Sequence, residues 1–121
     1  MNIKFGTDGW RAVIAEDFTF GNVAKVSQAI ADYVKNRLPM AGHREQSAIA
    51  IGYDMRFMGK EFAQAAADVI YGNGIKVYLS NGPTSTPALS LYIRQNKLTG
   101  GIMVTASHNP PRYNGIKYKA E

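Results

Sequence analysis

The chain has 121 residues, of which 45% are hydrophobic and 19% charged, and it contains no cysteine. This composition is typical of one globular domain with its own core, and it excludes a disordered or fibrous chain, a disulfide framework and thiolate metal sites. The formal net charge of +5 suits an anionic small ligand. Because the basic residues are scattered rather than gathered into a tract, we expect no nucleic-acid partner.

The amino-terminal residues show no targeting signal. Residues 1–8 lack the apolar core and cleavage site of a signal peptide, and no apolar run is long enough to cross a bilayer. We therefore expect a cytoplasmic location and no membrane partner.

The first half of the chain alternates between the helical and the strand period. Residues 22–38 carry apolar side chains at three- and four-residue steps, which predicts an amphipathic helix closed by Pro39. The apolar run 48–53 predicts a strand buried on both faces. A second helix is predicted over 61–71, ended by a Gly-Asn-Gly sequence that tolerates positive φ. The first helix is expected to turn these side chains inward: Val23, Val26, Ile30, Tyr33, Val34 and Leu38.

The second half continues the alternation. Residues 75–79 predict a strand, and a third helix runs to about Asn96, with Ser85 or Thr86 as N-cap and Pro87 at its first position. Residues 101–104 and 115–119 predict two more strands, the last returning antiparallel at the sheet edge. The pattern predicts a three-layer α/β/α fold of the α/β class. Its mixed, mostly parallel sheet has about four strands and an antiparallel edge strand.

The most informative motif is Thr-Ala-Ser-His-Asn-Pro at residues 105–110, directly after a predicted strand. Ligands of open α/β sheets bind at this carboxyl edge. A serine hydroxyl needs a base, a metal or fixed donors to react, whereas an ordinary turn serine only caps a neighbouring amide. Pairing of Ser107 with His108 is awkward, because adjacent residues on an extended segment point to opposite sides. With no acidic residue to complete a triad, hydrolase chemistry is disfavoured, and His108 could equally be a half-buried residue bonded to a carbonyl.

Two further segments could complete a phosphate site. In Asn-Gly-Ile-Lys at 114–117, a return strand would bring Lys117 beside Ser107, and Gly115 would allow close backbone approach. In Phe-Gly-Thr-Asp-Gly-Trp-Arg at 5–11, two glycines permit a tight turn beneath a phosphate and Arg11 offers a planar fork of donors. The alternatives are a solvated lysine on an edge strand and a surface arginine after a glycine-rich turn. We interpret Asn109 and Pro110 as loop-shaping residues.

Together, these three segments resemble the signatures of the α-D-phosphohexomutases, the phosphoglucomutase/phosphomannomutase family. The resemblance implies that Ser107 carries the phosphoryl group that passes to and from a hexose phosphate substrate. It implies catalytic roles for Ser107, Lys117 and His108, with Lys117 as general acid/base, and binding of substrate or phosphate by Arg11, His108 and Lys117. It also implies Mg²⁺, bound through the phosphoryl oxygen on Ser107 and an aspartate loop that this sequence lacks, and a hexose 1,6-bisphosphate activator.

The resemblance further implies that residues 1–121 are domain I, the phosphoserine domain, of a four-domain enzyme. We then expect this fragment to be inactive alone, to bind the missing domains of the same chain and to be capable of self-association. Thr105 mildly favours glucose or mannose phosphate, because the glucosamine-phosphate branch more often has serine there. The alternatives are a phosphoglucosamine mutase and a non-catalytic module that binds a phosphosugar or another anion.

Overall fold

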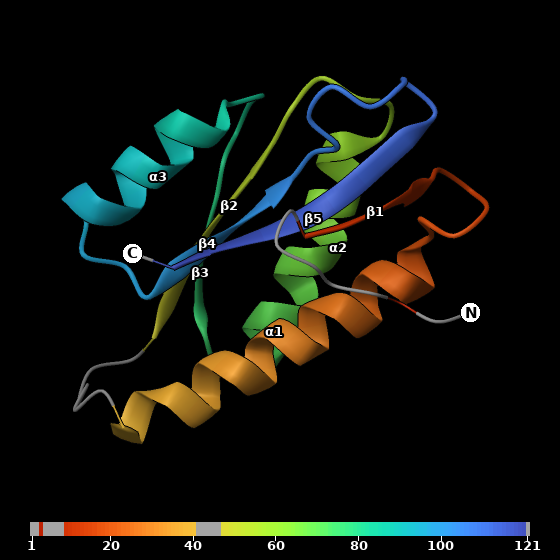
Figure 1. Cartoon of the computed structure of the whole chain (residues 1–121). Coiled ribbons are helices and arrows are strands. Elements are labelled where there is room, and N and C mark those ends of the chain that lie inside the picture. The colour runs from red at the N-terminus through yellow and green to blue at the C-terminus, as the bar shows by residue number, and fades with distance from the viewer. Residues whose placement is uncertain (1–2, 4–8, 41–46, 121) are drawn as a thin grey trace.

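The structure is a computed structural model that describes residues 3, 9–40 and 47–120. The elements follow in the order β1 (Trp10–Val13), α1 (Phe20–Met40), β2 (Ala48–Tyr53), α2 (Gly59–Gly72), β3 (Lys76–Leu79), α3 (Thr86–Gln95), β4 (Gly100–Val104) and β5 (Tyr113–Ala120). Helices α1 and α2 lie on one face of the sheet and α3 lies on the other (Figure 1). This arrangement confirms the predicted three-layer α/β/α class.

The described strands form one five-stranded sheet in the order β1-β5-β4-β2-β3. Strands β2, β3 and β4 run parallel, and β5 runs antiparallel to β4 and to β1. The prediction that β5 lies at the sheet edge is therefore wrong. The edge is taken by β1, which pairs Trp10 with Ile116 and which the sequence analysis placed inside a glycine-rich turn.

The helix boundaries differ slightly from the predicted ones. Helix α1 runs to Met40, so Pro39 lies inside its last turn instead of ending it. Proline removes one N–H donor, and losing one hydrogen bond near the end of a 21-residue helix does not stop it. Tyr33 is 50% exposed, because it lies at the border of the buried stripe. The Ser85 hydroxyl accepts from the Ala88 amide at 3.2 Å and caps α3, which places Pro87 at the second helical position.

Two apolar clusters hold the layers together. The larger one fills the space between the sheet and the helices α1 and α2, and its aromatic centre is Phe18, which stacks on Trp10 at 5.0 Å and meets Phe62 edge-on at 4.7 Å. The smaller cluster lies under α3 and contains Ala50, Leu89, Ile93, Leu98 and Met103. Helix α3 thus packs on β2 and β4, and no described helix covers β5 and β1 on that face. None of the described helices has the length and apolarity needed to span a membrane.

Candidate active site at the serine loop

The segment 105–112, here called the serine loop, connects β4 to β5 at the carboxyl edge of the parallel strands. Two backbone hydrogen bonds shape it, from the Asn109 amide to Ala106 O at 3.0 Å and from the Tyr113 amide to Pro110 O at 2.9 Å. Ser107 is exposed and has a φ of 53°, in the left-handed region that residues other than glycine rarely adopt. Strained backbone of this kind is concentrated at functional sites, where the surrounding structure enforces it.

His108 lies in the same turn as Ser107, not on an extended segment. The predicted reason against pairing, opposite side-chain directions along a strand, therefore does not apply. In the described part of the chain, no hydrogen bond joins the Ser107 hydroxyl to the His108 imidazole, and His108 is exposed. The interpretation of His108 as a half-buried residue is wrong, because the turn projects it into solvent.

Thr105 connects the serine loop to the end of β2. Its hydroxyl donates to Asp54 Oδ2 at 2.5 Å and accepts from the Ser107 amide at 3.0 Å. One buried threonine thus fixes the backbone nitrogen of Ser107 against a carboxylate that lies 51 residues earlier in the chain. Asp54 was not among the predicted site residues, although it directly follows the buried strand 48–53, at the same sheet edge as Ser107.

Arg56 was also missed. Its guanidinium donates hydrogen bonds to the carbonyl oxygens of four residues that form or flank the turn, which are Ser107, Asn109, Pro110 and Tyr113. Figure 1 shows the two segments involved, the β2–α2 connection and the serine loop, running next to each other at one end of the sheet. Nothing in the local sequence marks an arginine whose acceptors are all backbone groups.

The structure brings Arg11 to the serine loop, as predicted, through the pairing of β1 with β5. Arg11 lies opposite Gly115 in the register, and its Nη1 donates to Asn109 Oδ1 at 2.6 Å. A Cβ added to Gly115 would lie 2.5 Å from Trp10 O, 2.8 Å from Thr105 O and 2.9 Å from Arg11 Cγ. The missing side chain is therefore what lets the two neighbouring backbones and the Arg11 stem approach β5.

Lys117 lies in the interior of the sheet. It is half-buried and pairs with Met103, and β5 has neighbouring strands on both sides. The interpretation of Lys117 as an aggregation-blocking edge lysine is therefore wrong. Because side chains alternate along a strand, Lys117 shares the α3 face with Met103 and, across the sheet, with Arg11. No described helix covers this face of β5 and β1, and both cations are half-buried there.

The described residues do not form a magnesium site by themselves. No group of three or more histidine, aspartate or glutamate residues lies close enough together to hold a metal in the described ranges. Asp54 is beside the loop, but Oδ2 accepts from Thr105 and Oδ1 accepts from the Arg56 amide at 3.1 Å. An octahedral oxygen site needs several carboxylate, phosphoryl or water oxygens, so further ligands would have to come from elsewhere.

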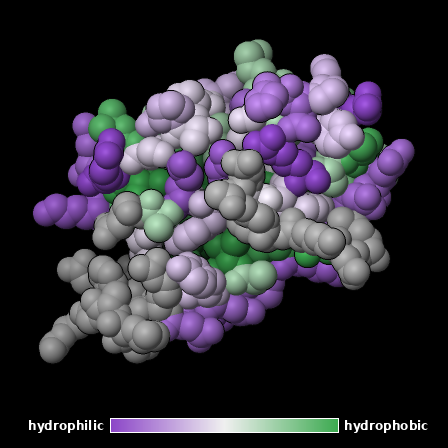
Figure 2. Space-filling view, in the orientation of Figure 1, coloured by the Kyte–Doolittle hydropathy of each residue, from purple (hydrophilic) through white to green (hydrophobic). Residues whose placement is uncertain are grey.

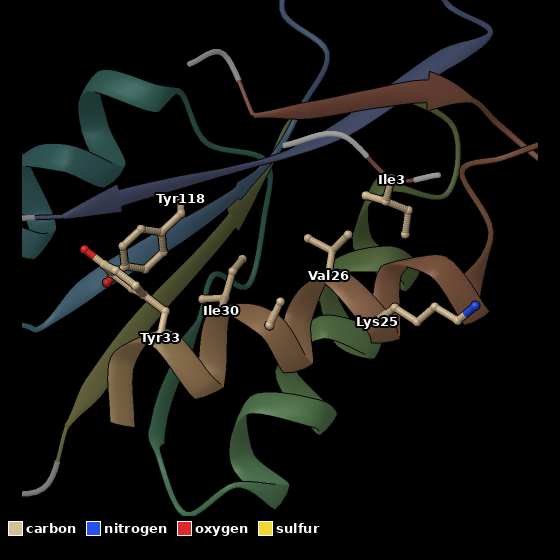
Figure 3. A pocket seen from close by; sticks show the side chains of 7 residues that line it. Ile3, Lys25, Val26, Ile30, Tyr33 and Tyr118 are labelled. Carbon is tan, nitrogen blue, oxygen red and sulfur yellow. The ribbon is translucent and has the colours of Figure 1, made fainter. Parts of the chain in front are cut away.

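A cavity of about 480 Å³ lies on the other face of the sheet, between α1 and β5. Figure 3 shows aliphatic side chains lining it together with Lys25, Tyr33 and Tyr118, and Figure 2 shows hydrophobic residues reaching the surface near the middle of this view. Its lining residues are Ile3, Lys25, Val26, Ala29, Ile30, Tyr33 and Tyr118. Because Tyr118 alternates with Lys117 along β5, this hollow is separated from the serine loop residues by the sheet itself.

Comparison with known proteins shows the same domain elsewhere. The family model described as phosphoglucomutase/phosphomannomutase, alpha/beta/alpha domain I, matches residues 2–121. A phosphoglucomutase from Staphylococcus saprophyticus is 37% identical over 95% of this chain and 20% of its own length. A phosphoglucosamine mutase from Prochlorococcus marinus is 39% identical over 97% of this chain and 24% of its own length.

A solved structure extends the likeness to three dimensions. A crystal structure from Thermus thermophilus, described as a candidate phosphomannomutase, superposes with a TM-score of 0.88 at 41% identity. The match covers 98% of this chain and 25% of the other. The chain thus spans about a fifth to a quarter of the length of these relatives. Because this family model matches residues 2–121, the chain belongs to the phosphoglucomutase/phosphomannomutase family and corresponds to its alpha/beta/alpha domain I.

Proposed function

We propose that this domain carries the reactive serine of a phosphohexomutase that interconverts hexose monophosphates. In the forward step, a hydroxyl oxygen of the hexose phosphate attacks phosphorus in line, the bond from phosphorus to Ser107 Oγ breaks, and a hexose bisphosphate forms. The hydroxyl proton passes to a general base. In the return step, Ser107 Oγ attacks the other phosphoryl group of the bisphosphate, which restores phospho-Ser107 and releases the isomeric monophosphate.

The observation that carries this proposal is an exposed serine whose backbone is fixed from several directions. Its φ of 53° is enforced by the Thr105 hydroxyl on its amide and the Arg56 guanidinium on its carbonyl. Rigid presentation of one hydroxyl suits a group that has to be in line with an incoming oxygen. A solvent-facing loop serine without function needs no such support.

The surrounding cations support the same proposal. A phosphoserine carries a charge of about −1.5 to −2 at neutral pH. Lys117 and Arg11 lie on the face of β5 and β1 that no described helix covers, and Arg11 contacts the loop through Asn109. We assign Lys117 as the candidate general acid/base, and Arg11, His108 and Lys117 as ligands of the substrate or its phosphate. Arg11 already uses Nη1 to bind Asn109, so it would meet phosphate with the rest of its fork.

The complete enzyme has to supply what this domain lacks. We propose that Mg²⁺ binds through the phosphoryl oxygen on Ser107 and through ligands in another domain. The metal would stabilise charge on the transferring group. A hexose 1,6-bisphosphate activator, the contacts with those domains, self-association of the isolated domain and a cytoplasmic location are also part of this proposal.

A second candidate substrate is glucosamine phosphate. It is favoured by one observation, the 39% identity to a phosphoglucosamine mutase. The predicted preference for glucose or mannose phosphate rests on Thr105. In this structure, Thr105 makes its contacts with Asp54 and the Ser107 amide, and these contacts need only a hydroxyl. A serine could make both, so Thr105 is a weak guide to the sugar.

The test uses the full-length protein that contains this domain. The protein is purified and its peptides are analysed by mass spectrometry for one added phosphoryl group on Ser107. Turnover of the 1-phosphates of glucose, mannose and glucosamine is then measured with Mg²⁺ and the matching bisphosphate, for wild type, Ser107→Ala and the helix α3 control Ser90→Ala. We expect phospho-Ser107 and loss of turnover in Ser107→Ala alone. Binding of the sugar phosphates without turnover by wild type would instead favour the non-catalytic module.

A further inference from the structure

Arg56 lies outside the three segments that carry the family resemblance, yet its side chain donates four hydrogen bonds to the serine loop and the residue after it. From the β2–α2 connection, Nη1 donates to Pro110 O and Tyr113 O, both at 2.9 Å. Nη2 donates to Ser107 O and Asn109 O, both at 2.7 Å. These four hydrogen bonds join one side chain to backbone oxygens that lie more than 50 residues away in sequence.

Asp54 holds the guanidinium in place. Its Oδ1 accepts from the Arg56 amide at 3.1 Å, and its Oδ2 lies 3.6 Å from Arg56 Nε. The Arg56 side chain is only 12% exposed, so the ion pair is shielded from solvent better than a surface pair. Since the same Oδ2 also accepts from Thr105, a single carboxylate aligns both the group that holds the Ser107 amide and the group that holds its carbonyl.

The convergence of four carbonyl oxygens on one point has an electrostatic consequence. Each carbonyl places the negative end of a peptide dipole toward that point, and without a cation these ends would repel one another and any phosphoryl group on Ser107. The guanidinium neutralises them. Arginine suits this position because its planar fork provides five N–H donors, whereas lysine provides three from a single nitrogen.

All five N–H groups of the Arg56 guanidinium face groups of the protein. Four N–H groups bind the carbonyls and the fifth, on Nε, faces Asp54. No donor is left to bind a sugar or a phosphate. We propose, building on the function proposed above, that Arg56 is a positioning residue: it clamps the serine loop and thereby fixes the direction in which the Ser107 hydroxyl or its phosphoryl group points.

This clamp acts on the rate of transfer rather than on binding. Misplacing a reacting group by about 1 Å costs on the order of a hundredfold in rate. Because Arg56 touches no substrate, its loss leaves the ground-state affinity for the hexose phosphate unchanged. A substrate-binding arginine would show the opposite pattern, a raised KM with an unchanged kcat.

The experiment compares Arg56→Lys with Arg112→Lys in the full-length protein. Arg112 is an exposed arginine of the same loop whose guanidinium lies over the Tyr113 ring at 5.3 Å, so the control matches in charge, chemistry and location. We measure kcat and KM for glucose 1-phosphate with glucose 1,6-bisphosphate, and hydrogen exchange of the amides in 105–113. For Arg56→Lys we expect kcat to fall by about a hundredfold with KM nearly unchanged, and faster exchange confined to this segment. Arg112→Lys should behave like wild type.

Two more variants keep the test decisive. In Arg56→Ala, guanidinium ion at non-denaturing concentration should restore part of kcat, and ammonium ion at the same concentration should not. If the Arg56 variants do not fold, Asp54→Asn removes the charge that aligns the guanidinium and should lower kcat without raising KM. A wild-type kcat in folded Arg56→Lys or, failing that, in Asp54→Asn overturns the proposal, and so does a raised KM alone. Full turnover in Ser107→Ala would refute the proposed function itself. Loop exchange that still rises in Arg56→Lys would then make Arg56 purely structural.

Discussion

Replacement of Gly115 by alanine tests how tightly the strands meet at the candidate site. The added Cβ would lie 2.5 Å from Trp10 O and 2.8 Å from Thr105 O, both well inside van der Waals contact. These oxygens belong to backbone on opposite sides of β5, because Trp10 is on β1 and Thr105 follows β4. A sideways shift of β5 that relieves one overlap therefore worsens the other.

The expected loss of stability follows from these contacts. Overpacking a close-packed site costs about 1–3 kcal/mol. Because no sideways shift of β5 relieves both overlaps, we expect the cost of Gly115→Ala to be near the upper end of this range. Alanine restricts the unfolded chain more than glycine does, and this lower entropy of the unfolded state offsets about 0.4–1 kcal/mol of the destabilisation. The net loss is then about 2 kcal/mol, which lowers the melting temperature of a domain of this size by roughly 6–10 °C. The Arg11 stem, 2.9 Å from the new Cβ, must also move, which disturbs its bond to Asn109.

The assay is thermal and urea unfolding of the 121-residue chain, with Gly72→Ala as the matched control. A Cβ at Gly72 meets no atom within 4 Å, and alanine is favoured over glycine in a helix by about 0.5–1 kcal/mol. We expect Gly115→Ala to be destabilised and Gly72→Ala to be as stable as wild type or slightly more so. Equal stability of Gly115→Ala and wild type would refute the reasoning, because it would mean that the strands separate at little cost.

Substitutions at three other positions test single features of the site. Ser107→Gly and Ser107→Ala should both lack the phosphoryl group. The free energy of unfolding from urea titrations should be about 1 kcal/mol higher for the glycine variant, because only glycine adopts the φ of 53° without strain. Equal free energies of unfolding would contradict the left-handed backbone at this position. Lys117→Met should lower kcat in the full-length protein by about a hundredfold or more, as expected for a proton-transfer group; an effect on KM alone would make Lys117 a phosphate anchor. Thr105→Val should lose about 1–3 kcal/mol of stability, since Asp54 and the Ser107 amide both lose a partner, and Thr105→Ser should lose much less. Wild-type stability of Thr105→Val, with a loss in Thr105→Ser alone, would show that the methyl group matters and the hydroxyl does not.

Most of the fold could be predicted from the sequence because its signals are local. The runs 48–53 and 61–71 have enough length for their periods to be recognised, and Ser85 caps α3 as one of the two predicted N-caps. Strand β1 was not predicted, because Trp10 and Arg11 were interpreted as the end of the glycine-rich segment 5–11. Its pairing with β5 depends on contacts with residues about a hundred positions later. The error on β5 follows from the same omission, since β5 lies at the edge only if β1 is left out.

Some residues of the candidate site could be predicted from the sequence and others could not. Ser107, Lys117 and Arg11 lie in motifs that the sequence displays, and the structure places Arg11 against the serine loop and Lys117 on the adjoining face. Asp54 could have been found by applying the carboxyl-edge rule to β2 as well as β4. Arg56 could not be found as a partner of the serine loop, because apart from Asp54 its partners are peptide carbonyls, which every residue carries and which leave no mark on the sequence.

The place of β1 in the sheet has a consequence for the order in which the protein forms during synthesis. Of the described strands, β1 is made first, yet it pairs among them only with β5, the last one. Residues 10–13 must therefore wait until residues 113–120 have left the ribosome. Strands β2, β3 and β4, with their helices, can associate earlier because their contacts are closer in sequence. The edge that carries Arg11 is then completed last, together with the part of the core that Trp10, Ala12 and Ile116 form, so most strands and helices of a nascent chain are packed before the proposed phosphate site is complete.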